Sequence, residues 1–230
     1  MSGSIPAPAP ASRSFDVVIV GGGAAGTAAS CALGSGGVNA AIIDLHEVCP
    51  PDFKADKVAG DQIGLMRRLG LFDALVSAGV RSNNVVNMRR GRVLDRHGSC
   101  EYNLPYEDLV NAMRRATPSS VARIVGRVAN IEATDDRQRV ELSSGETIEA
   151  RLVILATGGG EALRAKLGYV RRVLHKDHSV SVAFDLRPVG RQHQPSIEYA
   201  DKRHPLGGKT LNGRQQDRAL DLGQLGGVEQ

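Results

Sequence analysis

The sequence predicts an α/β fold built around a parallel β-sheet, and three neighbouring features predict it. Residues 15–20 form a short, mostly β-branched apolar run that ends abruptly in the glycines Gly21, Gly22 and Gly23. An Ala-rich segment comes next, and residues 38–44 form a second apolar run. A strand, a helix and a second strand within about thirty residues are typical of a parallel βαβ unit.

The helix of this unit is predicted from an Ala-rich stretch with apolar residues at helical spacing, and glycines end it. The spaced residues are Ala25, Ala28, Ala29, Ala32 and Leu33, and the glycines are Gly34, Gly36 and Gly37. Residues 63–69 predict a second helix, closed by Gly70, after a loop rich in Pro, Lys and Asp. Two or three short strands are expected between residues 85 and 103.

The next helix begins near residue 107, because apolar residues follow the i, i+3, i+4, i+7 pattern from Leu109 to Ala116. Acidic residues at its start and basic residues at its end suit the helix dipole, and Pro118 ends it. Residues 125–150 alternate in short segments between polar turns and predict a β-meander. Residues 152–156, LVILA, then predict a strand buried on both faces.

Composition and charge exclude several function classes. The formal charge of +4 and the pI near 9.1 are modestly basic, but the charges are scattered and aromatic residues make up 3% of the chain. Nucleic-acid binding is therefore not expected. The three cysteines Cys31, Cys49 and Cys100 show no CxxC spacing, and the six histidines show no metal-ligand spacing. We expect neither a disulfide framework nor a metal site.

The first 14 residues alternate Pro and Ala, with no basic start and no apolar run. They predict a flexible arm over residues 1–14 rather than a signal peptide. No stretch reaches the ~18 consecutive apolar residues of a membrane-spanning helix. We expect a soluble, cytoplasmic protein.

The sharpest motif is DVVIVGGGAAG, which places Gly21, Gly23 and Gly26 at the positions of a GxGxxG pattern. The first glycine permits a tight turn, the second lets the backbone approach a pyrophosphate, and the third lets the helix pack closely on the strand. The phosphates would lie at the positive end of the helix dipole, among the N–H groups around Gly22 and Ala25.

An acidic residue, Asp44, ends the second strand 18 positions after Gly26. This spacing is close to the ~20 residues expected for a carboxylate that accepts hydrogen bonds from a ribose. The alternative is a Gly-rich turn in an unrelated α/β fold, with Asp44 capping a strand.

The order of elements after this unit bears on the choice between FAD and NAD. A long inserted segment and a β-meander precede the buried strand LVILATGGG, whereas an ordinary NAD domain continues with further crossovers. This order resembles the FAD-binding fold of the glutathione-reductase type, in the branch of flavoprotein monooxygenases and geranylgeranyl-reductase-like enzymes. The resemblance covers residues 15–186. A plain NAD-binding dehydrogenase domain stays an alternative.

The resemblance implies a Rossmann-like FAD-binding domain with an inserted β-meander over residues 15–168. The start of a second, truncated substrate domain would occupy residues 169–187. It further implies that residues 57–75 run beneath the flavin. Val128 matches the position whose backbone meets the adenine, and the closing motif near the cofactor matches Ala156, Thr157 and Gly158.

Two positions depart from the family pattern. Many monooxygenases have Asp-Gly where this chain has Thr157-Gly158, and that Asp is linked to NADPH contacts. Tyr106 stands where relatives often carry an Arg. Because the flavin carries the redox chemistry in this class, no catalytic side chain is assigned.

The resemblance implies an FAD-dependent oxidoreductase, specifically a monooxygenase that uses NAD(P)H and acts on a small organic substrate. An isoprenoid reductase or a flavin halogenase would share the same N-terminal half. The alternative from another class is a non-catalytic, truncated remnant that retains the nucleotide-binding fold.

Residues 178–188, HSVSVAFDLRP, predict an alternating strand that opens the substrate domain. The rest of the chain has no strand period and no sustained helical stripe, so residues 188–230 predict a disordered or frameshifted tail. With no counterpart of the family's late Gly-Asp motif, we expect weak FAD binding and no turnover from this chain alone.

Overall fold

The computed structural model of the chain describes residues 13–52 and 54–174. The described residues divide into two compact units. The first unit contains residues 13–51, 69–71 and 110–172, and the second contains the remaining described residues. The predicted strand at residues 178–188 and the predicted tail lie outside the described residues, as does most of the predicted arm.

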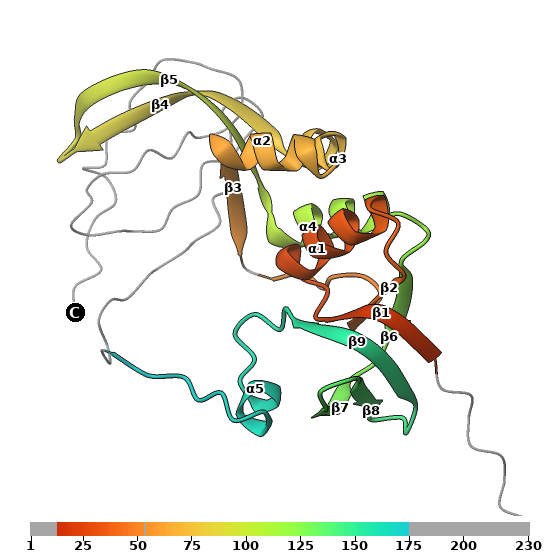
Figure 1. The fold of residues 1–230 in the computed structure, drawn as a ribbon. Helices are drawn as coiled ribbons and strands as arrows, with labels where there is room; N and C mark the ends of the chain where they lie inside the picture. The colour runs from red at the N-terminus through yellow and green to blue at the C-terminus, as the bar shows by residue number, and fades with distance from the viewer. Residues whose placement is uncertain (1–12, 53, 175–230) are drawn as a thin grey trace, which may run out of the picture. The chain divides into compact units, whose positions relative to one another are not determined.

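The first unit is built on a six-stranded sheet with the order β6-β2-β1-β9-β8-β7. Its strands are β1 (Arg13–Val20), β2 (Ala40–Asp44), β6 (Ala122–Val125), β7 (Val128–Ala133), β8 (Gln138–Leu142) and β9 (Thr147–Leu155). Strand β1 pairs in parallel with both β2 and β9, and β2 pairs in parallel with β6. Strands β9, β8 and β7 form an antiparallel meander. The predicted α/β fold, its parallel βαβ unit and its meander are therefore confirmed (Figure 1).

Two details of this sheet differ from the prediction. Strand β1 begins at Arg13, inside the predicted arm, because Arg13 pairs in register with Ile148 of β9. Strand β6 was not predicted, and it forms the parallel edge of the sheet beside β2. Four residues are too few to show a period in the sequence, so only the pairing partner identifies such a strand.

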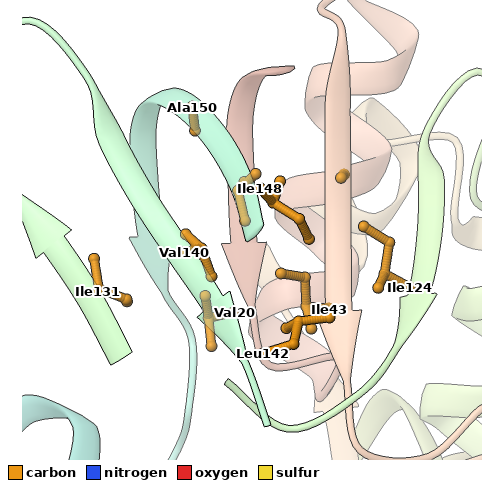
Figure 2. Close-up of a cluster of buried hydrophobic side chains, with 10 residues drawn as sticks. Val20, Ile43, Ile124, Ile131, Val140, Leu142, Ile148 and Ala150 are labelled. Atoms are coloured by element: carbon orange, nitrogen blue, oxygen red, sulfur yellow. The ribbon is translucent and has the colours of Figure 1, made fainter. Parts of the chain in front are cut away.

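The main core of this unit lies between the parallel strands and the meander. Alternate residues of β1 and β2 point into it together with apolar residues of the meander, as Figure 2 shows. The ten buried members are Val18, Val20, Ala41, Ile43, Ile124, Ile131, Val140, Leu142, Ile148 and Ala150. The intervening residues of β1 and β2 form a second cluster, against which Ala29 and Leu33 of helix α1 (Ala24–Ser35) pack. Both faces of the parallel strands are thus used, as parallel sheets require.

The prediction that residues 152–156 are buried on both faces is wrong for the described part of the chain. Leu152 is 54% exposed, and the other four residues are half-buried. Val153 and Leu155 pack on the main core, whereas Ile154 and Ala156 pack on the second cluster. The strand therefore lies inside the sheet, but each face is only partly covered by the described residues.

The second unit is built on a three-stranded antiparallel sheet with the order β3-β5-β4. Its strands are β3 (Ala55–Ala59), β4 (Val80–Arg89) and β5 (Arg92–Pro105), and its helices are α2 (Asp61–Arg68) and α3 (Phe72–Ala78). Strands β4 and β5 form one long curved ribbon (Figure 1). Phe72 packs edge-on against Tyr102, with ring centroids 6.0 Å apart.

Helix α2 confirms the predicted helix at residues 63–69. Two or three short strands were expected between residues 85 and 103, and the structure has two, β4 and β5, which are longer than expected and form a single hairpin turned by Arg90 and Gly91 with φ of 50° and 74°. Two successive positive φ values define the type I′ turn that suits the twist of a hairpin. The expected loop before α2 contains β3, which forms because Ala55–Ala59 pairs with the end of β5.

Helix α4 (Tyr106–Ala116) confirms the predicted amphipathic helix, and a short helix α5 (Ala162–Lys166) comes after β9. In the described part of the chain, no helix combines the length and hydrophobicity needed to cross a membrane.

Candidate nucleotide site

The first glycine of the GxGxxG motif turns the chain tightly against the end of β9. Gly21 has φ of +108°, and a Cβ placed on it would lie 2.4 Å from the carbonyl oxygen of Ala156. The amide of Gly21 donates to the carbonyl of Ile43 at 2.8 Å. The amide of Ala156 donates to the carbonyl of Val20, also at 2.8 Å. Since both the conformation and the space exclude a side chain, this position requires glycine.

The third glycine permits the close contact between the turn and helix α1. A Cβ on Gly26 would lie 1.8 Å from the carbonyl oxygen of Gly21, and Gly26 is itself buried. The packing role that the motif predicts for Gly26 therefore matches the geometry.

Helix α1 begins at Ala24, directly after the glycine turn. Gly23 is the N-cap residue in an extended conformation, and as a glycine it supplies no side-chain cap of its own. Amide groups in the first turn of a helix have no acceptor within the helix, and the helix dipole makes this end positive. With Gly23 half-buried and Ala25 exposed, the turn presents amides suited to an anionic group.

Asp44 lies at the carboxyl end of β2, and its carboxylate is tied to the glycine turn. Its Oδ2 atom accepts the amide of Gly22 at 2.7 Å, and its Oδ1 atom accepts the amide of His46 at 2.9 Å. The side chain remains 26% exposed. A carboxylate has about four acceptor sites, so Oδ2 retains capacity for a hydroxyl donor.

Arg114 of helix α4 completes this arrangement, although no sequence motif predicts a role for it in the site. Its Nε and Nη2 atoms donate to the carbonyl of Gly22 at 2.9 and 2.6 Å, and Nη2 lies 3.1 Å from Oδ1 of Asp44. Its Nη1 atom donates to the carbonyls of His46 and Glu47 at 2.7 and 3.0 Å. The pattern is invisible in sequence because 92 positions separate this arginine from Gly22.

Two further polar side chains hold the same region. The hydroxyl of Thr27, fully buried, donates to the carbonyl of Gly22 at 3.1 Å. Asn111, three residues before Arg114 on α4, accepts the amide of Cys49 at 2.8 Å and donates to its carbonyl at 3.1 Å. The segment after β2 is therefore fastened to α4 at two places.

The other predicted site residues follow the end of β9 or begin β7. Ala156 contacts the turn through Gly21, and Gly158 has φ of +57°. Thr157 donates from its hydroxyl to the carbonyl of Gly160 at 3.4 Å. Val128 pairs with Leu142 of β8 and packs on the main core.

The residues beside Asp44 are instead those at the end of β6. Asp44 pairs in register with Val125, and its carbonyl accepts the amide of Gly126 at 2.8 Å. Val125 and Leu45 are exposed apolar side chains, at 58% and 46%. An apolar surface next to a carboxylate that can accept a hydrogen bond from a ribose hydroxyl is suited to a flat heterocyclic base.

The donor set fits a dinucleotide cofactor. It combines a turn without side chains, a helix start whose N-cap residue is a glycine, and a carboxylate with remaining acceptor capacity. These are the elements that bind a pyrophosphate and a ribose in Rossmann-type folds.

The family model described as "FAD binding domain" matches residues 14–220 of the chain. The matched range therefore includes residues 188–220, which the sequence pattern assigned to the tail. A curated relative, the 3-demethoxyubiquinol 3-hydroxylase of Escherichia coli strain K12, is 26% identical over 170 residues. That alignment covers 66% of this chain and 44% of the hydroxylase, so the chain spans less than half the length of this relative.

Solved structures show the same fold at low sequence identity. The p-nitrophenol 4-monooxygenase PnpA from Pseudomonas putida DLL-E4 superposes with a TM-score of 0.61 at 19% identity, covering 68% of this chain and 44% of PnpA. The flavin-dependent monooxygenase PieE, solved in complex with FAD and substrate, gives 0.58 at 23% identity, with 70% and 33% covered. The family model matches most of the length of this chain, which shows that the chain belongs to the FAD binding domain family, whose cofactor is FAD.

Proposed function

We propose that the chain is the nucleotide-binding part of an FAD-dependent monooxygenase that takes electrons from NAD(P)H and oxidises a small organic substrate. The observation that carries the proposal is the tie between the glycine turn and Asp44 through the amide of Gly22, at 2.7 Å. This tie holds a ribose acceptor beside the start of helix α1, whose N-cap residue is a glycine. The hydroxylase and monooxygenase relatives support the reaction class.

In this proposal each part of the turn has one task. The amides of Gly23 and Ala25 bind the pyrophosphate, the amide of Gly22 holds the Asp44 carboxylate, and Gly21 and Gly26 keep the backbone close to β9 and to the helix. The remaining acceptor site on Oδ2 of Asp44 takes a ribose hydroxyl. When bound, FAD supplies the redox chemistry, and the protein holds and polarises it.

The remaining assignments extend this site. We assign the adenine to the apolar surface of Leu45 and Val125, with the backbone near Val128 closing it. Ala156, Thr157 and Gly158 are assigned to the region where the cofactor leaves the sheet. The domain boundaries at residues 168 and 187 and the cytoplasmic location also remain proposals.

The test is a titration of the purified chain with FAD, followed by turnover assays with NAD(P)H and oxygen. We expect the titration to show weak FAD binding that is lost in Gly23→Val, where a side chain would occupy the approach of the pyrophosphate. Substrate-dependent oxygen uptake matched by hydroxylated product would support a monooxygenase.

Other outcomes bear on the alternatives. Reduction of an isoprenoid double bond without oxygen uptake would identify a reductase, and halide incorporation would identify a halogenase. FAD binding without any turnover is the outcome expected of the nucleotide-binding part alone, and it would support the FAD site without identifying the reaction. A colourless protein that binds NAD would overturn the assignment of the site to FAD.

A further inference from the structure

The carbonyl group of Gly22 accepts three hydrogen bonds from two side chains. It accepts from Nε and Nη2 of Arg114 at 2.9 and 2.6 Å and from the hydroxyl of Thr27 at 3.1 Å. Because a peptide unit is planar and trans, its C=O and the next N–H point in opposite directions. Fixing the carbonyl of Gly22 therefore fixes the direction of the Gly23 amide, at the start of helix α1.

Arg114 has no nitrogen left for a ligand. Its five N···O contacts, at 3.1 Å or less, involve all three guanidinium nitrogens. A guanidinium carries five N–H donors, so the contacts match the donors. The side chain is also 11% exposed. These contacts exclude a direct phosphate-binding role for Arg114 in this arrangement.

The same side chain also holds the carboxylate. Nη2 of Arg114 pairs with Oδ1 of Asp44, the atom that accepts the amide of His46, and leaves Oδ2 to the amide of Gly22. Arg114 thus contacts both halves of the site, the peptide that orients an amide and the carboxylate that accepts a hydroxyl. Planar bidentate geometry of this kind is specific to arginine.

We propose that Arg114 is the positioning residue of the nucleotide site, which orients the Gly22–Gly23 peptide and the Asp44 carboxylate for the ADP half of FAD. This inference rests on the proposed role of the turn and Asp44. It deepens that role, because it makes the geometry of a local glycine motif depend on one side chain of helix α4.

The first experiment needs no cofactor. Amide hydrogen exchange is measured by NMR in the full chain, in Arg114→Gln and in the matched control Arg115→Gln, which removes a charge from an exposed neighbour. In Arg114→Gln the amides of Gly22 and His46 should exchange about tenfold faster or more, because both donate to Asp44 and open locally once it is released. The amide of Val140 in the core should change less.

Two results of this experiment would overturn the inference. One is equal exchange at Gly22 and His46 in the two variants, and the other is the same acceleration at every amide including Val140, which would show a merely structural role. If Arg114→Gln does not fold, Arg114→Lys gives the same comparison. Lysine keeps the charge beside Asp44 but lacks the fork that holds the Gly22 carbonyl.

The second experiment uses ADP as the probe, measured by calorimetry. ADP affinity should fall about tenfold in Arg114→Gln and stay unchanged in Arg115→Gln. When combined with Asp44→Asn, the loss should be smaller than the product of the two single losses, because Arg114 acts through Asp44. Equal ADP affinity in wild type and Arg114→Gln would overturn the inference and leave the proposed function standing. Absent ADP binding by the wild type would instead contradict the proposed site, while the exchange result would still decide the role of Arg114.

Discussion

Replacing Gly26 with alanine adds a single carbon atom where the structure leaves no room for it. The new Cβ would lie 1.8 Å from the carbonyl oxygen of Gly21, whereas real Cβ contacts essentially never fall below 3.0 Å. The helix and the turn must therefore separate by about 1.2 Å. Neither side yields easily, because the obstacle is backbone and the amide of Gly21 is bonded to Ile43.

Overpacking of a core costs about 1–3 kcal/mol, and the backbone obstacle places this variant at about 3 kcal/mol. For a chain of this length each kcal/mol shifts Tm by about 2–4 °C, so Tm should fall by about 6–12 °C. The measurement is thermal unfolding followed by far-UV circular dichroism, together with an FAD titration that should show weakened binding.

The matched control is Gly36→Ala at the other end of the same helix. Gly36 has φ of −81°, and its Cβ would meet the nearest atom at 3.4 Å, an ordinary contact. The Tm of the Gly36→Ala variant should remain within about 2 °C of the wild-type Tm. If Gly26→Ala behaved like Gly36→Ala, the close contact between the turn and α1 would not exist in solution, and the explanation of the motif would fail.

Two further substitutions test the carboxylate of the site and the charge pattern of the hairpin. Asp44→Ala should weaken the affinity for FAD by roughly ten- to a hundredfold. It should also lower the free energy of unfolding by about 2 kcal/mol, because Arg114 loses its counter-ion. Equal FAD affinity of the wild type and the variant, measured by calorimetry, would contradict the ribose role of Asp44. Hydrogen bonds from Asn87 and His97 hold the pKa of Asp95 below its ordinary value. Because the pKa of this carboxyl is lower in the folded chain than in the unfolded chain, its ionised form stabilises the hairpin at pH values above the unfolded-state pKa. This stabilisation is lost as the pH falls through the folded-state pKa. Asn87→Ala should therefore raise the pKa of Asp95, and an unchanged pKa in an NMR titration would refute this.

Local patterns predicted the elements of the fold whose causes lie close together in sequence. The β-branched run, the small-residue helix and the glycine spacing placed β1, α1 and β2 within a few residues of their ends. Strand β3 escaped because ADKVA has no strand period of its own and becomes a strand by pairing with β5. The hairpin β4–β5 was predicted as shorter pieces, since Arg90-Gly91 is a weaker turn signal than Asn-Gly or Asp-Gly.

The site shows the same division between local and distant causes. Gly21, Gly26 and Asp44 were identified because their roles follow from a motif and a spacing. Val128 was chosen by resemblance and stays a prediction, whereas the contacts of Asp44 with Val125 and Gly126 became visible only in the structure. Arg114 carried no pattern beyond a basic residue at a helix end, and its partners become visible only when the chain is folded.

A glycine motif therefore fixes where a nucleotide loop can turn, but it does not fix which way each peptide in the loop points. Gly22 has no side chain to restrict its own ψ, and the Gly22–Gly23 peptide could rotate either way at little steric cost. Contacts 22 and 92 positions away in sequence select one orientation for each of the two peptides that flank Gly22: Asp44 accepts the amide of Gly22 in the Gly21–Gly22 peptide, and Arg114 donates to the carbonyl of Gly22 in the Gly22–Gly23 peptide. Two chains with the same GxGxxG pattern can therefore differ in nucleotide affinity because of a helix outside the motif. In this chain that helix is α4, and the positioning residue that we propose on it is Arg114, whose three guanidinium nitrogens all contact oxygen atoms of the site.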